Sequence, residues 1–184
     1  IDGQNIAEVT KGSLRENIGI VPQDCVLFND TLGANIRYGK LDCTPDELLR
    51  AIEDAELDQV INKLPNKLDT RVGERGLRLS GGEKQRVAMA RMLIKKPKIM
   101  VFDEATSSLD AHVERQIQNN IRKISKNITT IIIAHRLSTI TYANLILVMD
   151  HGEIKERGTH AELLAKNGLY AELWKRRFDN GPEA

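Results

Sequence analysis

The sequence lacks the features that direct a chain across a membrane, onto nucleic acid or into an oxidising compartment. Its 184 residues carry 27 basic and 26 acidic side chains, so no excess charge favours nucleic acid or an acidic partner. The longest apolar runs, near Ile131 and Leu145, are strand-sized and fall short of the roughly 18–20 residues that span a bilayer. Cys25 and Cys43 are too few for a disulfide framework. We therefore expect no transmembrane segment, no signal peptide and no nucleic-acid partner, and a reducing compartment.

Strand-like and helix-like stretches alternate along the chain, which predicts an α/β fold with a mostly parallel sheet covered by helices. The predicted strands are four short apolar runs: residues 18–21, 98–102, 129–134 and 145–149. Between the second and third of these, four apolar residues recur at helical spacing and predict a crossover helix: Val113, Ile117, Ile121 and Ile124. The last strand continues through a glycine-containing turn into residues 154–157, which predicts a hairpin.

Residues 31–91 carry helix-start signals and apolar residues at helical spacing in place of strand-like runs. They predict a helical insert between the first and second strands of the sheet. Thr44 is followed by a proline and, three residues after the cap, by Glu47, which together predict the start of a helix. A shorter helix is predicted over about residues 58–64. Near the end of the chain, another capping box predicts a helix that ends at Gly168, followed by a final amphipathic helix.

Polar residues follow three of the predicted strands: Gln23 after the first, Asp103 and Glu104 after the second, and His135 after the third. In open α/β sheets the ligand crevice lies outside the carboxyl ends of the strands. Each residue alone has the plain interpretation of a polar strand end or a surface turn. Three such ends in one chain predict a common site at this edge of the sheet.

The run Leu79-Ser80-Gly81-Gly82-Glu83 opens another predicted helix, which extends to about Lys95. A helix N-terminus offers free amides and about half a positive charge, so it suits a phosphate group, although serine is also an ordinary N-cap. We expect the apolar side chains of this helix to face a core. Four basic residues are predicted to form a solvated face: Lys84, Arg86, Lys95 and Lys96.

About twenty residues after this run comes Ile99-Met100-Val101-Phe102-Asp103-Glu104, and the pair resembles the signature and Walker B motifs of ATP-binding cassette ATPases. Other segments resemble the Q-loop (Val21 to Asp24), the stretch before the signature in exporters (Thr70 to Gly76) and the D-loop (Ser108 to Asp110). Residues 26–39 are similar to B-subfamily, type IV exporters, most of all to the mitochondrial and bacterial half-transporters for iron–sulfur or heavy-metal cargo.

The resemblance implies that ATP and Mg²⁺ are the ligands and that ATP hydrolysis powers transport. It assigns catalysis to Glu104, which polarises the attacking water, together with Gln23 and His135. It assigns the metal to Asp103 and Gln23. The residues that it assigns to the nucleotide are Leu79, Ser80, Gly81, Gly82, Glu83, Asp110 and His135.

The same resemblance implies partners and a location. Two cassettes pack head to tail, so the residues Ser80 to Gly82 serve an ATP held by a second nucleotide-binding domain, and Asp110 runs along the dimer seam. Residues 71–75 and those just after Gln23 contact the coupling helices of a transmembrane domain. The chain is then membrane-associated, on the cytoplasmic or mitochondrial-matrix face of an inner membrane.

One part of the family pattern is missing, since no G-x-x-x-x-G-K-[ST] phosphate loop occurs in the sequence. We therefore expect an incomplete P-loop NTPase-type core. Residues 1–184 would be the C-terminal portion of a nucleotide-binding domain, with a helical subdomain over about residues 31–91 and the remaining core over 98–177. The chain also begins at Ile1 rather than methionine, which predicts a fragment or a processed piece.

The missing loop has an energetic consequence for the chain by itself. Charge-assisted hydrogen bonds contribute roughly 1.5–3 kcal/mol each, and a sub-millimolar to micromolar ligand has only about 4–8 kcal/mol of binding free energy to lose. We therefore expect the isolated chain to be inactive. Two alternatives remain: an ATPase of DNA repair or chromosome organisation, disfavoured because no heptads are sustained, and a non-catalytic truncated cassette that donates its LSGGE motif to a partner ATPase.

Overall fold

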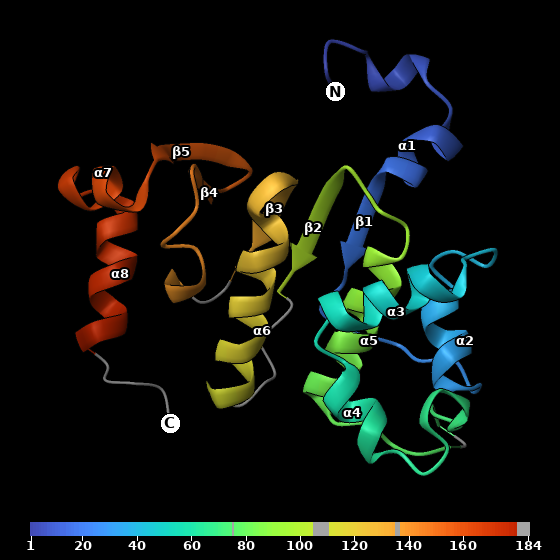
Figure 1. Ribbon diagram of the computed structural model, residues 1–184. Coiled ribbons are helices and arrows are strands. Elements are labelled where there is room, and N and C mark those ends of the chain that lie inside the picture. Colours follow the sequence, from blue (N-terminus) through green and yellow to red (C-terminus); the bar gives the residue numbers. More distant parts are fainter. Residues whose placement is uncertain (75, 105–110, 135–136, 180–184) are drawn as a thin grey trace. The chain divides into compact units, whose positions relative to one another are not determined.

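The computed structural model describes residues 1–74, 76–104, 111–134 and 137–179, and the chain divides into two units, residues 1–133 and 134–184. The first unit contains a parallel three-stranded sheet in the order β1 (Ile18–Val21), β2 (Ile99–Asp103), β3 (Thr129–Ile133) (Figure 1). The three predicted strands are therefore confirmed, with β2 starting one residue later than expected and β3 ending one residue earlier. None of the helices in the described part of the chain is long and apolar enough to cross a membrane.

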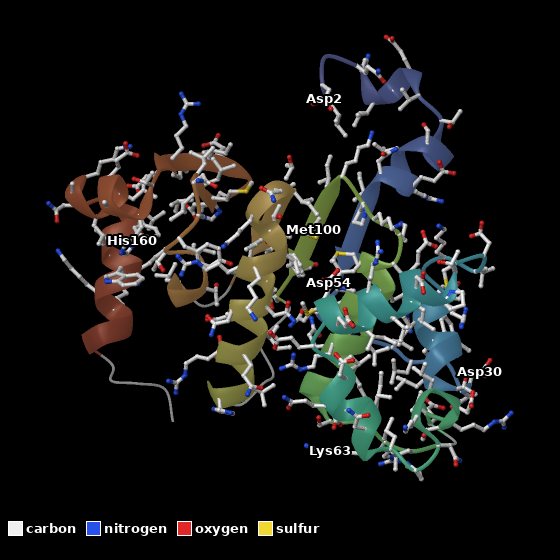
Figure 2. All side chains as sticks on the ribbon, viewed as in Figure 1. Asp2, Asp30, Asp54, Lys63, Met100 and His160 are labelled. Atoms are coloured by element: carbon white, nitrogen blue, oxygen red, sulfur yellow. The ribbon has the colours of Figure 1, made fainter. Side chains whose placement is uncertain are left out.

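The two faces of this sheet differ in burial. Met100 and Phe102 of β2 are fully buried, in the same core as side chains of α5 (Gly81–Leu93) and α6 (Ala111–Ile124). Figure 2 labels Met100 on the central strand. Successive side chains of a strand point to opposite faces, so Ile20 and Ile131, which align with Val101, lie on the other face of the sheet. Ile20 is 59 % exposed and Ile131 is 52 % exposed. Within the described residues of the first unit, helices cover one face of the sheet, and Ile20 and Ile131 on the other face are exposed.

The predicted helical insert lies between β1 and β2. It contains α2 (Leu32–Arg37), α3 (Pro45–Asp54) and α4 (Asp58–Lys63), a short 3₁₀ turn (Lys67–Asp69), and then α5. Each of α2, α3 and α5 begins where a Thr or Ser side chain accepts a hydrogen bond from a backbone amide in the first turn. The stretch before β1 holds a 3₁₀ turn (Ile6–Glu8) and α1 (Lys11–Asn17), and another 3₁₀ turn (Ser125–Asn127) follows α6.

The second unit is a hairpin packed against two helices. After a 3₁₀ turn (Leu137–Thr139), β4 (Ile146–Asp150) and β5 (Glu153–Gly158) pair antiparallel, and α7 (His160–Ala165) and α8 (Leu169–Asp179) follow. The predicted hairpin is confirmed, with His151 and Gly152 at positive φ (48° and 78°) in its turn. His160, labelled in Figure 2, lies with its Nδ1 2.8 Å from the hydroxyl of Tyr170.

Helix α7 ends at Ala165, three residues earlier than the predicted end at Gly168. The physical reason is the positive φ of Asn167 (50°), which a right-handed helix cannot contain. The carboxylate of Glu156 then accepts hydrogen bonds from the amides of Leu169 (2.8 Å) and Tyr170 (3.0 Å). These bonds satisfy the first amides of α8, so the chain leaves one helix and starts the next within a few residues.

Candidate active site

The carboxyl ends of β1 and β2 bring three predicted site residues to one edge of the sheet. Val21 pairs with Phe102, so Gln23, two residues past β1, and Asp103, the last residue of β2, follow neighbouring strands. Asp103 is half-buried and Gln23 is exposed. This edge is where an open parallel sheet presents its ligand crevice.

Glu104 leaves β2 through an unusual backbone conformation. Its φ is +46°, in the left-handed region that few residues other than glycine adopt, and its amide donates a 3.0 Å hydrogen bond to the carbonyl of Ile133. That bond ties the residue to the end of β3, the neighbouring strand. Six other residues that are not glycine share a positive φ in the described part of this chain, so the feature that sets Glu104 apart is its place at the end of the central strand.

Oxygen ligands at this edge fit a magnesium ion. Carboxylate and amide oxygens are the donors that Mg²⁺ prefers, and it is usually bound by one or two carboxylates together with substrate phosphates and water. Asp103 and Gln23 supply one of each kind of donor. In the described ranges no cluster of three or more His, Cys, Asp or Glu residues occurs.

The start of α5 forms a second group of candidate residues, separate from the sheet edge. The hydroxyl of Ser80 accepts a hydrogen bond from the amide of Glu83 (3.3 Å), and the Glu83 carboxylate accepts one from the amide of Ser80 (2.8 Å). This capping box leaves the amides of Gly81 and Gly82 at a helix N-terminus, where no intrahelical acceptor exists. Free amides and the positive end of a 13-residue helix suit a phosphate oxygen.

One expectation about α5 is wrong. Arg86 was predicted on a solvated face, but it is only 8 % exposed. Its guanidinium donates to the carbonyl of Ala55 (3.3 Å), the carboxylate of Glu56 (3.2 Å) and the side-chain oxygen of Gln116 (3.1 Å). A buried guanidinium requires such partners, and here they come from the end of α3 and from α6.

The thiol of Cys25 lies beside α5 and is not a nucleophile at neutral pH. It donates a 2.8 Å hydrogen bond to the side-chain oxygen of Gln85, and burial raises its pKa to about 11. A pKa this high favours the protonated thiol, and only a thiolate is a good nucleophile. The role of Cys25 is therefore to pack the segment after Gln23 against the helix.

Two predicted site residues, Asp110 and His135, lie outside the described residues. For the others, the structure groups Gln23, Asp103 and Glu104 at the sheet edge and Leu79 to Glu83 at the start of α5.

The family model for the ABC transporter matches residues 1–107, more than half of the chain. The chain belongs to the ABC transporter family. This match includes both the sheet edge and the start of α5.

Named relatives narrow the resemblance within ABC transporters. The chain is 55 % identical over 183 residues to an ATM1-type heavy metal exporter of Novosphingobium aromaticivorans, which covers 100 % of this chain and 30 % of the exporter. It is 53 % identical to the human ATP-binding cassette sub-family B member 6, covering 95 % of this chain and 21 % of that protein. A solved bacterial Atm1-family ABC exporter with ATP bound matches all of this chain with a TM-score of 0.89 and 53 % identity.

This ABC transporter chain spans about a third or less of the length of these relatives. The match to the solved exporter confirms the predicted α/β fold of the nucleotide-binding domain in this family. The predicted likeness to Atm1-type and B-subfamily half-transporters is confirmed as well.

Sequence reasoning missed the buried polar residues of α5. Gln85 and Arg86 are 4 % and 8 % exposed, and Arg91, in the last turn, contacts residues far away in sequence. One signal was available, because Arg86 lies one helical turn before Ala90, which we placed in the core. The contacts of Arg91 depend on the fold of the insert and left no signal along the sequence.

Proposed function

We propose that residues 1–184 are the C-terminal portion of the nucleotide-binding domain of an ABC exporter, which hydrolyses ATP to power transmembrane transport. Within it, residues 31–91 form the helical subdomain and residues 98–177 the rest of the core. The observation that carries this proposal is the convergence of Gln23, Asp103 and Glu104 at one sheet edge, in a chain more than 50 % identical to metal exporters.

Each residue at the sheet edge has a role that its chemistry supports. Glu104 accepts the proton of the attacking water, held in position by its left-handed backbone and its bond to β3. Asp103 and Gln23 would hold Mg²⁺ through their side-chain oxygens, and the ion would supply charge stabilisation to the phosphates. His135 donates to a phosphate oxygen and Asp110 contacts the dimer partner.

The start of α5 serves a nucleotide held by a second nucleotide-binding domain, in a head-to-tail dimer. The support is the hydroxyl of Ser80 and the amides of Gly81 and Gly82, which lie at a helix N-terminus that belongs to neither β1 nor β2. The relatives include an ATM1-type heavy metal exporter and sub-family B members, and if the full-length protein is a half-transporter like those that the sequence resembles, it needs a second copy to complete the site. Leu79, which is 7 % exposed and lies in the core, and Glu83, whose carboxylate accepts from the amide of Ser80, hold this turn in place.

The open face of the sheet supports an incomplete core. Ile20, Ile131 and Ile133 are 59 %, 52 % and 49 % exposed, and Val101, which pairs with both Ile20 and Ile131, is only partly buried in the described residues. A nucleotide-binding domain needs a phosphate loop, which this sequence does not contain. We infer that additional chain carrying this loop covers the face, and that the 184 residues alone do not hydrolyse ATP.

The surface just after Gln23 is the proposed docking site of a membrane domain. Val26, Phe28 and Tyr38 are 71 %, 44 % and 59 % exposed, which is unusual for apolar and aromatic side chains so close together. The domain then lies at the cytoplasmic or mitochondrial-matrix face of an inner membrane. Because basic and acidic residues nearly balance in the sequence, we do not propose a nucleic-acid partner.

Turnover of Mg²⁺·ATP by the full-length gene product tests the function. Glu104→Gln keeps the shape of the side chain but removes the base, so we expect turnover to fall by about 10²–10⁴-fold. Glu172→Gln, at an exposed position of α8, is the matched control and should leave turnover unchanged. Turnover that persists in the Glu104→Gln variant would contradict the assignment. A wild-type protein without turnover that stimulates a partner ATPase would favour the non-catalytic cassette.

A further inference from the structure

A single guanidinium, that of Arg91 in the last turn of α5, reaches across to the segment after Gln23. Its Nε donates to the backbone carbonyl of Asn35 (2.9 Å), one terminal nitrogen to the side-chain oxygen of Asn35 (3.0 Å), and the other to the carbonyl of Val26 (3.2 Å). Its carbon lies 5.3 Å from the ring centroid of Phe28 and 5.8 Å from that of Tyr38. Both distances are within the range of a cation–π contact.

The side chain of Asn35 extends this contact. It is 1 % exposed, and its oxygen accepts a second hydrogen bond from the amide of Phe28 (2.8 Å). Its nitrogen donates to the carbonyls of Phe28 (3.1 Å) and Thr31 (3.0 Å). Arg91 therefore contacts the ring of Phe28 directly and is linked to the Phe28 backbone through the side chain of Asn35.

The outer side of this assembly is exposed. We call Val26, Phe28 and Tyr38 the Phe28 patch; its two rings lie 4.5 Å apart, centroid to centroid. The inner side is α5, whose first turn presents Ser80 and the glycines. Helix α5 is continuous from Gly81 to Leu93, and a rigid element of this kind can carry coupling between its two ends.

We propose that Arg91 is a positioning residue that couples the Phe28 patch to the phosphate-binding turn at the other end of α5. The inference rests on the proposed function, because it takes the start of α5 to bind nucleotide. A membrane-domain helix docked on the patch then acts on Ser80 through α5, with Arg91 as the contact that joins the patch to the helix. The hydrogen bond from Cys25 to Gln85 is a second link between the same segment and the same helix.

Arginine is required at this position for a geometric reason. Its planar fork donates in three directions at once, to two atoms of Asn35 and to Val26, and presents a flat face to both rings. Lysine keeps the positive charge but is a compact point donor. We therefore expect Arg91→Lys to weaken the coupling between the Phe28 patch and α5 and to leave the net charge unchanged. Arg50→Lys, at an exposed position of α3, is the matched control.

Hydrogen–deuterium exchange of the full-length protein, with and without Mg²⁺ and AMP-PNP, tests the coupling. In the wild type and in Arg50→Lys, the nucleotide should slow exchange over residues 84–88 and over residues 29–38, the latter by roughly tenfold, the scale of one charge-assisted hydrogen bond. In Arg91→Lys, protection of residues 84–88 should remain and that of residues 29–38 should fall to within about twofold of the unliganded state.

The outcomes separate this inference from the function on which it rests. Protection of residues 29–38 that survives in Arg91→Lys, or that is absent in the wild type, overturns the role of Arg91 while the nucleotide site stands. A wild type with no protection at residues 84–88 contradicts the nucleotide site, and the coupling falls with it. If Arg91→Lys does not fold, Phe28→Ala on the exposed side carries the same test, with the same expected loss over residues 29–38.

Discussion

The helical insert and the sheet of the first unit differ in how their apolar side chains become buried. In the insert, helices start at local caps such as Thr44 and Ser80, and their apolar side chains meet in one buried core. In the sheet, only one face is buried. Phe102 has no exposed surface, whereas Ile131, on the neighbouring strand, is 52 % exposed. The comparison teaches that short-range signals complete a helical subdomain, while a parallel sheet needs cover from segments far away in sequence.

The largest expected effect is a contrast between the two faces of the sheet. In the 184-residue chain, Phe102→Ala removes a fully buried ring and should lower the free energy of unfolding by about 3–5 kcal/mol. Ile131→Ala, on the open face, should cost less than about 1 kcal/mol. Urea unfolding followed by circular dichroism measures both.

The same pair sharpens the comparison in the longer domain. If additional chain covers the open face, Ile131→Ala in the complete nucleotide-binding domain should cost about 2–4 kcal/mol, as a buried position does. A cost below about 1 kcal/mol in both forms would show that this face stays open, against our proposal.

A second contrast concerns the caps of α3 and α5. Thr44→Ala and Ser80→Ala each remove one capping hydrogen bond and should each cost about 0.5–2 kcal/mol of stability. In the full-length protein, Ser80→Ala should also lower ATP turnover by roughly 10- to 100-fold, because a donor to a charged phosphate is lost. Thr44→Ala, which only caps its helix, should leave turnover unchanged; an equal loss in both variants would reduce Ser80 to a structural cap.

The smallest expected effect is a pH dependence within the insert. Glu47 accepts hydrogen bonds from Lys96 (2.8 Å), Lys40 (2.9 Å) and the amide of Thr44, and these lower its pKa from an ordinary 4.5 to about 2. Since the folded state binds its proton less readily, the stability from this group is present above about pH 4.5 and is lost as the pH falls toward about 2. Glu47→Gln should remove this part of the acid dependence of urea unfolding.

Glu53→Gln, at an exposed position of the same helix, should leave the acid dependence of the unfolding midpoint as it is in the wild type. A wild-type profile that coincides with that of Glu47→Gln between about pH 2 and pH 5 would show that the two lysines do not act on this carboxylate.

Much of the fold could be predicted from the sequence because its signals are local. The strand β1, the capping box at Thr44 and the hairpin turn at Gly152 each depend on residues within one short segment. What could not be predicted depends on distant partners. The register of β1 against β2 and the hydrogen bonds that Glu156 accepts at the start of α8 are examples.

The candidate site divides in the same way. Gln23, Asp103 and Glu104 were predicted from strand ends and family motifs, and the structure brings them to one sheet edge. The left-handed backbone of Glu104 could not be read from the sequence, since it is imposed by the neighbouring strand. Arg86 was misplaced because a charged side chain was assumed to be solvated, although three partners from other elements pair with it in the core.

Turnover of Mg²⁺·ATP by the purified 184-residue chain, measured beside the full-length gene product, tests the central claim most directly. The account predicts turnover by the full-length protein and none above background by the 184 residues, whose sheet has an open face and whose sequence has no phosphate loop. Turnover by the 184-residue chain that disappears in its Glu104→Gln variant would contradict it.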